Sequence, residues 1–83
     1  MSKIIMGFVL HERVKTASQV QELLSKYGCE INTRLGLHVA SSKDCSPQGL
    51  IILEFIDDAE IAVENFQKEL LKIADVDIQK MTF

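Results

Sequence analysis

The sequence contains no tryptophan, one proline, four glycines and two cysteines among its 83 residues. So little proline and glycine leaves no stretch that could serve as a flexible linker, and the chain contains no internal repeat. We therefore expect a single domain that spans residues 1–83. Aromatic residues make up only 6% of the chain. Its core must be built mainly from isoleucine, leucine and valine.

An excess of basic residues is also absent. Nine Lys and Arg stand against 12 Asp and Glu, which gives a net charge of −3, and the basic residues are scattered. Proteins that bind a phosphate backbone use clustered Lys and Arg, so direct nucleic-acid binding is not expected. The apolar segment SKIIMGFVL (2–10) is too short to span a membrane and lacks a signal-peptide cleavage site. We expect a cytoplasmic protein without a membrane partner.

Catalytic motifs are missing as well. The chain has no Ser–His–Asp, Cys–His or P-loop pattern and no glycine-rich fingerprint. Without a secretion signal, Cys29 and Cys45 are expected to be reduced thiols rather than a disulfide. These absences predict a non-enzymatic protein.

Four segments have the polarity pattern of β-strands. Residues 3–10 and 50–56 are apolar at both alternating positions, which is typical of central strands covered on both faces. Residues 29–39 and 75–83 alternate between apolar and polar side chains, as half-exposed strands do. The polar segment SSKDCSPQG (41–49) predicts a loop between the second and third strands.

Two helices are predicted between these strands, because apolar residues recur there at steps of three and four. Thr16 with Gln19, and Asp57 with Glu60, have the spacing of a capping box. Gly28 fits the left-handed position that ends many helices. The two apolar stripes consist of Ala17, Val20, Leu24 and Tyr27, and of Ala59, Val63, Phe66, Leu70 and Ile73.

The resulting order βαββαβ predicts an α+β, ferredoxin-like fold: a four-stranded antiparallel sheet with both helices on one face. Right-handed crossovers place the first and third strands at the centre. Two helices cover only one face of the sheet, so apolar side chains are left on the other. A soluble monomer rarely exposes such a patch, which predicts a homo-oligomer assembled through the sheet. Depending on register, the exposed set would come from Ile5, Val9, Ile51 or Ile52, Leu53 and Phe55.

The segment ASQVQELLSKYGCEINTRLGLH resembles the iron-only hydrogenase system regulators, a family of small ACT-like proteins. The resemblance is carried by the YG of Tyr27 and Gly28, by RLG at residues 34–36 and by the closing VDIQKM (76–81). It implies an ACT-like oligomer with a regulatory role. The ligand-sensing domain of nickel-responsive repressors, which has the same βαββαβ order, is more distantly similar.

His38 and Cys45 are candidate metal ligands. Imidazole and thiolate suit nickel or zinc, and the nickel-responsive domain uses histidines followed by a cysteine. The pair supplies two of the three or four ligands that such a metal needs, and His11 and Glu12 of a neighbouring chain could supply others. The alternative is that His38 and Cys45 are a strand-end residue and a loop residue without a common role.

The turn LHERVK (10–15) is a candidate site for an amino acid or another small ligand, because ACT-like domains often bind one at the turn between the first strand and the first helix. His11, Glu12 and Arg13 lie in this turn, and Arg13 could hold a carboxylate with two hydrogen bonds. Arg34 is a further candidate, because it could cross an oligomer interface to a carboxylate. A solvated turn and a plain surface arginine are the alternatives.

These observations predict a non-enzymatic regulatory or sensing module that binds a small ligand, an amino acid or a metal, near an oligomer interface. A role in transcription or in a hydrogenase system follows from the resemblance alone. An assembly domain without a ligand and a small ferredoxin-like enzyme are the two alternatives.

Overall fold

A computed structural model of the chain describes residues 2–11, 13–37 and 49–83. Four strands and two helices follow one another in the predicted order βαββαβ. The strands form one sheet in the order β2-β3-β1-β4, and every neighbouring pair is antiparallel. The ferredoxin-like fold predicted from the sequence is therefore confirmed. The elements are β1 (Ile4–Leu10), α1 (Arg13–Lys26), β2 (Ile31–Leu37), β3 (Gly49–Phe55), α2 (Glu60–Ile73) and β4 (Val76–Thr82).

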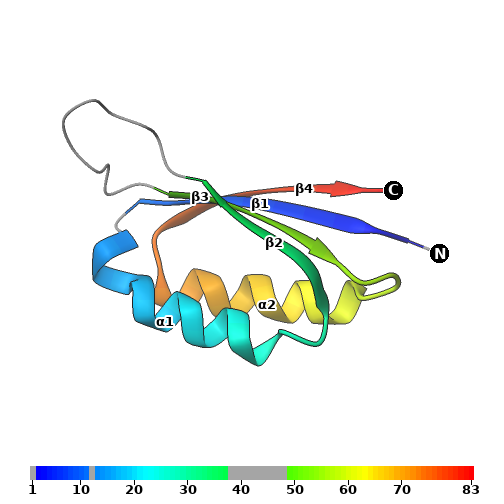
Figure 1. Cartoon of the computed structure of the whole chain (residues 1–83), viewed down its shortest axis with the longest axis horizontal. Helices are drawn as coiled ribbons and strands as arrows, with labels where there is room; N and C mark the ends of the chain where they lie inside the picture. Colours follow the sequence, from blue (N-terminus) through cyan, green and yellow to red (C-terminus); the bar gives the residue numbers. More distant parts are fainter. Residues whose placement is uncertain (1, 12, 38–48) are drawn as a thin grey trace.

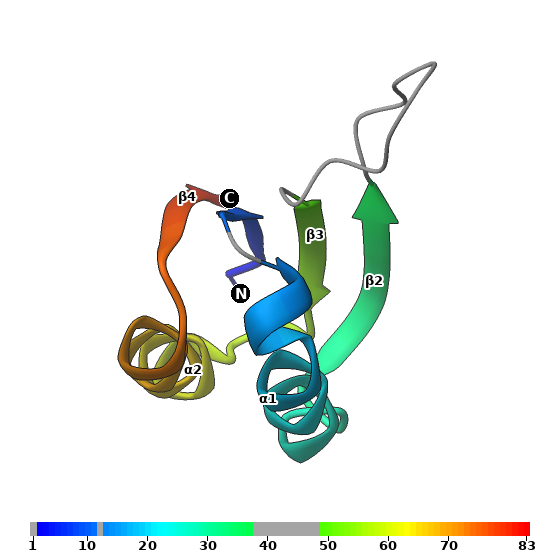
Figure 2. The same cartoon turned by 90° about the vertical axis from the view of Figure 1, so that its left-hand side faces the viewer.

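The molecule has two layers. Both helices lie on the same side of the sheet, and no helix or strand of the described residues covers the other side (Figure 1). Seen from the side, the strands run in the order β4, β1, β3, β2 above the two helices (Figure 2). None of the helices in the described ranges is long and apolar enough to cross a membrane.

The core lies between the sheet and the helices. In β1, alternate residues from Ile4 to Leu10 are buried, and the residues between them are partly exposed. This is the alternation that a strand covered on one face should have. The buried hydrophobic set consists of Ile4, Met6, Phe8, Leu10, Val20, Leu23, Leu24, Leu53, Phe55, Val63, Phe66 and Leu70.

Phe66 of α2 lies at the centre of this core. Its ring centroid is 6.3 Å from that of Phe8, 5.9 Å from that of Phe55 and 5.4 Å from that of Tyr27. The tilted and edge-to-face geometries are those that aromatic pairs prefer. The predicted stripe of α2 is correct here, because Val63, Phe66 and Leu70 are all buried.

The sequence does not decide which face of the third strand points away from the helices, and the structure does. Leu53 and Phe55 have no exposed surface and face the helices. Ile52 lies on the opposite side, since it pairs with Gly7 and alternates with Leu53. Leu53 and Phe55 therefore do not belong to the exposed set in which the sequence analysis placed them.

Three predicted helix-end features are wrong. α1 begins at Arg13, so Thr16 and Gln19 lie inside the helix and not at its cap. Ala59 is the cap residue of α2 and makes no side-chain capping bond. Gly28 has no left-handed backbone. A Cβ at Gly28 would lie 3.2 Å from the carbonyl oxygen of Ser25, so a close approach of the backbone accounts for the glycine.

The turn between β3 and α2 is tied to the start of the chain instead. Asp58 has φ of 59°, in the left-handed region that aspartate tolerates better than most residues. Its Oδ1 accepts a hydrogen bond from the amide of Ser2 at 2.9 Å, and its own amide donates to the Ser2 carbonyl at 2.9 Å. These two bonds hold the turn before α2 against the start of the chain.

Candidate functional site

The side of the sheet that faces away from the helices, called the open face below, carries apolar side chains that neither helix covers. Register places Leu35 of β2 opposite Ile52, and Met81 of β4 opposite Ile5. Leu35, Met81 and Phe83 are 50%, 54% and 71% exposed. All four strands thus contribute to it. Its apolar residues are Ile5, Val9, Leu35, Leu50, Ile52, Met81 and Phe83.

Gly7 lies in the middle of the open face. It belongs to β1, one of the two inner strands, and pairs with Ile52 of β3 on one side and with Gln79 of β4 on the other. A Cβ added at Gly7 would meet no atom within 4 Å. The sheet surface is therefore bare at this position, and no other part of the described chain fills the space.

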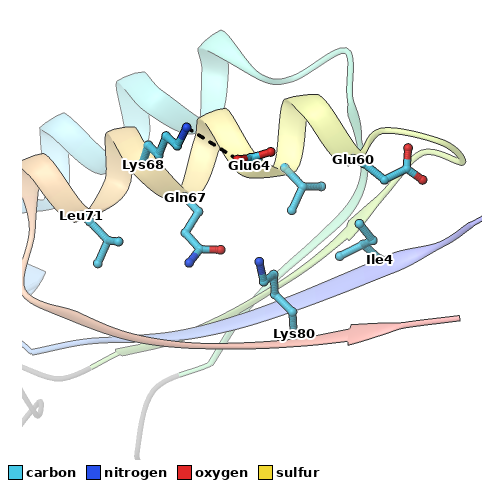
Figure 3. Close-up of a pocket in the computed structure, with 8 residues that line it drawn as sticks. Ile4, Glu60, Glu64, Gln67, Lys68, Leu71 and Lys80 are labelled. Atoms are coloured by element: carbon cyan, nitrogen blue, oxygen red, sulfur yellow. Dashed lines mark ion pairs between the residues drawn. The ribbon is translucent and has the colours of Figure 1, made fainter.

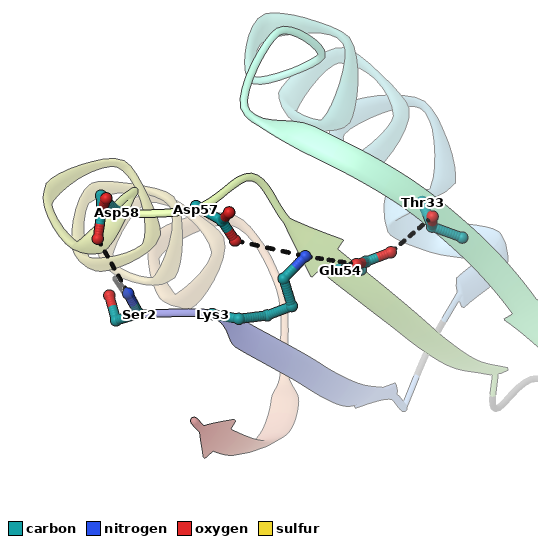
Figure 4. Close-up of polar contacts among 6 residues, drawn as sticks. All are labelled: Ser2, Lys3, Thr33, Glu54, Asp57 and Asp58. Carbon is teal, nitrogen blue, oxygen red and sulfur yellow. Dashed lines mark hydrogen bonds and ion pairs between the residues drawn. The ribbon is translucent and has the colours of Figure 1, made fainter.

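A polar cluster borders the open face where β1 begins (Figure 4). Lys3 Nζ lies 2.8 Å from Glu54 Oε2 and 3.4 Å from Asp57 Oδ1. The hydroxyl of Thr33 donates to Glu54 Oε1 at 2.8 Å. The hydrogen bond from Lys3, followed by the one from Thr33, holds the pKa of Glu54 below its ordinary value. The same bond raises the pKa of Lys3.

His11 borders the opposite end of the face. Its Nε2 lies 2.9 Å from Asp77 Oδ2, and its amide donates to the carbonyl of Asp75 at 3.1 Å. Asp77 alternates with Ile78 and pairs with Val9, which places it on the open face. This predicted ligand-binding residue is thus engaged with β4.

Arg34 lies on the other face of the sheet. Its Nη2 donates to Gln21 Oε1 of α1 at 2.7 Å. It pairs with Leu53, whose side chain is buried under the helices. The side chains of Arg34 and its neighbour Leu35 point to opposite faces of the sheet, so Arg34 lies on the helix side and not on the open face. The structure does not bring Arg34 and His11 together within one chain, because β3 lies between their strands and they face opposite ways.

For the remaining candidate residues, a role in ligand or metal binding stays a prediction. Arg13 is the first residue of α1. Glu12, His38 and Cys45 lie outside the described residues. Within the part that the structure describes, no group of three or more His, Cys, Asp and Glu side chains could hold a metal ion.

A groove of about 460 Å³ lies between α2 and β4 (Figure 3). Lys80 reaches into it from β4, and Gln67 reaches toward β4 from the helix. The Oε1 atom of Gln67 is buried and has no hydrogen-bond partner. Glu64 and Lys68 form an ion pair of 3.6 Å along one rim. The groove is lined by Ile4, Glu60, Val63, Glu64, Gln67, Lys68, Leu71 and Lys80.

This groove can accept a small molecule with both polar and apolar parts. Among the described residues, the Lys80 amine has no carboxylate partner and could bind an anionic group. Glu60 could bind a cationic group, and Ile4 with Val63 forms an apolar wall. Sequence reasoning missed the groove, although the alternation of β4 already places Lys80 on the same side as Ile78.

Comparison with solved structures supports the fold. An uncharacterized protein from Thermotoga maritima superposes with a TM-score of 0.73 at 22% identity, over 100% of this chain and 99% of that one. CPII, a nitrogen regulatory PII-like protein from Thiomonas intermedia K12 bound to ADP, AMP and bicarbonate, gives 0.65 at 9% identity, over 100% and 91%. The de novo designed protein Foldit4 gives 0.64 at 14% identity, over 99% and 94%.

No protein-family model matches the sequence, and no curated protein matches it. A designed protein and a nitrogen regulatory protein are similar to this chain to almost the same degree. These likenesses therefore establish the ferredoxin-like architecture, and the functional argument depends on the surfaces of this chain.

Proposed function

We propose that the chain is a non-enzymatic regulatory module that binds a small ligand and transmits the binding through contacts between copies. The observation that carries the proposal is the open face. Seven apolar side chains from the sheet and its C-terminal end lie on a surface that neither α1 nor α2 covers. Such a surface is typical of a chain that works with a partner.

The ligand site best supported by geometry is the groove between α2 and β4. Its amine, carboxylate and apolar wall suit an amino acid, whose carboxylate would bind Lys80 and whose ammonium would bind Glu60. The sequence instead predicts an amino-acid site at the turn of His11. A metal bound through His38 and Cys45 is the second candidate for the ligand.

β4 offers a route from the groove to the open face. Lys80 pairs with Met6 on the helix side, and Met81 pairs with Ile5 on the open face. The two side chains are adjacent in sequence and point to opposite sides of an edge strand. A ligand that draws Lys80 toward α2 would therefore shift Met81 at the surface where copies meet.

The comparisons lend support of a general kind. One of the similar structures is a nitrogen regulatory PII-like protein that holds ADP, AMP and bicarbonate. The resemblance of residues 17–38 to the iron-only hydrogenase system regulators points to regulation as well. Nucleotides and bicarbonate therefore belong among the ligands to be tested.

Thermal-shift measurements test the proposal. We expect the melting temperature to rise with the concentration of one ligand class among amino acids, adenine nucleotides, bicarbonate, nickel and zinc. The Lys80→Ala variant should lose the response to a groove ligand, and Lys72→Ala, which removes an exposed lysine outside the groove, should keep it. If no class gives a shift, the sensing role is wrong and an assembly domain is favoured. Turnover of any bound compound would contradict the non-enzymatic role.

A further inference from the structure

Gly7 is in a position where glycine is costly. Glycine in the interior of a strand weakens it, because it has no side chain to pack and loses more backbone entropy on folding. β1 lies inside the sheet, where Gly7 pairs in register with Ile52 of β3 on one side and with Gln79 of β4 on the other. Its φ is not positive, so the backbone conformation does not require glycine.

No steric need for glycine arises inside the chain either. A Cβ at Gly7 would meet nothing within 4 Å, whereas a Cβ at Gly28 would meet a backbone oxygen. A strand glycine without an internal reason often marks a place where another molecule approaches closely. In this chain the place is the centre of the open face.

The charges around the open face are compatible with a second copy of the same face. Lys3 is paired with Glu54 at one end, and His11 contacts Asp77 at the other. Lys3 lies between Glu54 and Asp57, so both signs of charge are present at that end, and the Asp77 side chain is 76% exposed at the other. Two such faces can therefore meet with these charged groups left in solvent at the two ends. The described residues of this face therefore include both basic and acidic side chains, rather than the single sign of charge that would favour a nucleic acid or another strongly charged partner.

The size of the face fits a modest dimer interface. Four strands of seven residues cover about 19 Å by about 24 Å, given a strand spacing of ~4.8 Å and a rise of ~3.4 Å per residue. Two such faces together cover roughly 900 Å² as a flat footprint, and the accessible area of a corrugated surface is larger. Specific interfaces begin at roughly 1,000 Å². The area is sufficient for a reversible dimer.

We propose that two copies of the chain pack open face to open face about a two-fold axis, and that side chains of the second copy enter the space over Gly7. Sheets that pack in this way lie ~10 Å apart, a gap that the side chains of both sheets normally fill. Gly7 leaves its share of that gap empty, so longer side chains of the partner can fill it. The inference deepens the oligomer of the proposed function and rests on it.

Two glycine variants test the packing. Gly7 and Gly36 both have open space around a built Cβ, but Gly36 pairs with Ile51 and lies on the helix side of β2. Valine has a higher strand propensity than glycine, so both variants should fold. Sedimentation equilibrium should give a dimer dissociation constant for Gly7→Val that is at least about tenfold higher than that of the native chain. This corresponds to a loss of about 1.4 kcal/mol of binding free energy. Gly36→Val should match the native chain.

A second pair of variants keeps the test decisive if Gly7→Val does not fold. Met81 is 54% exposed and Ile61 of α2 is 77% exposed, but only Met81 lies on the open face. Met81→Lys should weaken the dimer and Ile61→Lys should not, with circular dichroism confirming the fold of each.

Three results would overturn the proposal. The native chain could sediment as a 9.3 kDa monomer at high micromolar concentration. Gly7→Val and Met81→Lys could both dimerise like the native chain. Gly36→Val alone could dissociate the dimer, which would indicate edge-to-edge pairing through β2. Failure of the sensing role appears separately, as a dimer with this mutational pattern whose melting temperature responds to no ligand.

Discussion

Tyr27 donates its hydroxyl hydrogen to Oε2 of Glu69, a bond that joins the end of α1 to α2. The other oxygen of the same carboxylate accepts a hydrogen bond from Lys26 Nζ at 2.7 Å. Because the phenol is hydrogen-bonded to a carboxylate and partly desolvated, the pKa of Tyr27 rises to about 12. The bonds from Lys26 and Tyr27 lower the pKa of Glu69.

The titration of Tyr27 can be measured directly, since the chain has one tyrosine and no tryptophan. Ultraviolet difference spectroscopy should give a phenol pKa of about 12 in the folded chain. In Glu69→Gln the neutral amide no longer disfavours the phenolate, so the pKa should move toward the ordinary value of about 10. Glu64→Gln, on the exposed part of α2, should leave it unchanged. A native pKa near 10 would show that the bond does not persist in solution.

The same bond makes stability depend on alkaline pH. The folded chain keeps the phenol proton to a higher pH than the unfolded chain, whose pKa is about 10. The contribution of this bond to the free energy of unfolding should therefore be constant below about pH 10 and fall as the pH rises toward 12. Urea unfolding of the native chain and Tyr27→Phe over this range should give a steeper fall for the native chain.

Because of Glu54, we expect the free energy of unfolding to fall in acid as the pH decreases. Lys3 and Thr33 lower its pKa in the folded chain, so their contribution is present above the unfolded value of about 4.3 and is lost as the pH falls through the folded value. Glu54→Gln should be less stable than the native chain at neutral pH and should lose less stability on acidification. Urea unfolding at a series of pH values measures both. Parallel curves for the two proteins would mean that the cluster in Figure 4 does not hold the carboxylate.

The sequence predicted the fold because local patterns agree with the tertiary structure. Alternation in β1 and the helical stripe of α2 both reappear as buried sets. Register was harder to predict, because the segment LIILEF is apolar at both alternating positions. The single charge in it, Glu54, does mark the open face, since a carboxylate is costly to bury. That signal would have assigned Leu53 and Phe55 to the core.

Two local irregularities could not be predicted from periodicity. The alternation predicted for residues 29–39 would put Ile31 on the same face as Leu35, but a bulge between Ile31 and Thr33 separates them. Ile31 therefore packs against the core, and Leu35 lies on the open face. Likewise, Asp57 had the spacing of a helix cap, but it contacts Lys3, a residue far away in the sequence. Such contacts depend on the assembled fold and leave no local pattern.

The His38 and Cys45 prediction can be tested without knowledge of their geometry. If the pair binds a transition metal, equilibrium dialysis with nickel or zinc should give a bound metal in the native chain, and His38→Ala and Cys45→Ser should each lose most of it, since each removes one of the few ligands. Cys29→Ser is the matched control, because Cys29 is an exposed free thiol at the end of α1. Unchanged stoichiometry in the first two variants would exclude the site.

The aromatic cluster around Phe66 predicts the largest single-residue effect on stability. Phe66 has no exposed surface, and its ring packs against Phe8, Phe55 and Tyr27. Phe66→Ala should lower the free energy of unfolding by about 3–5 kcal/mol, since it removes a buried ring and leaves a cavity. A domain of this size has only about 5–15 kcal/mol in total, so the variant should be close to unfolding.

Ile61→Ala is the control for this effect. Ile61 lies on the same helix but is 77% exposed, so its truncation should change the free energy of unfolding by no more than about 0.5 kcal/mol. Urea unfolding at neutral pH measures both variants. If the two substitutions lower the free energy of unfolding by the same amount, α2 is not held to the sheet through Phe66. The groove between α2 and β4 would then not be bounded by a fixed helix. A large cost at Phe66 alone shows that α2 is anchored, so that a ligand bound to Lys80 would move the edge strand rather than the helix.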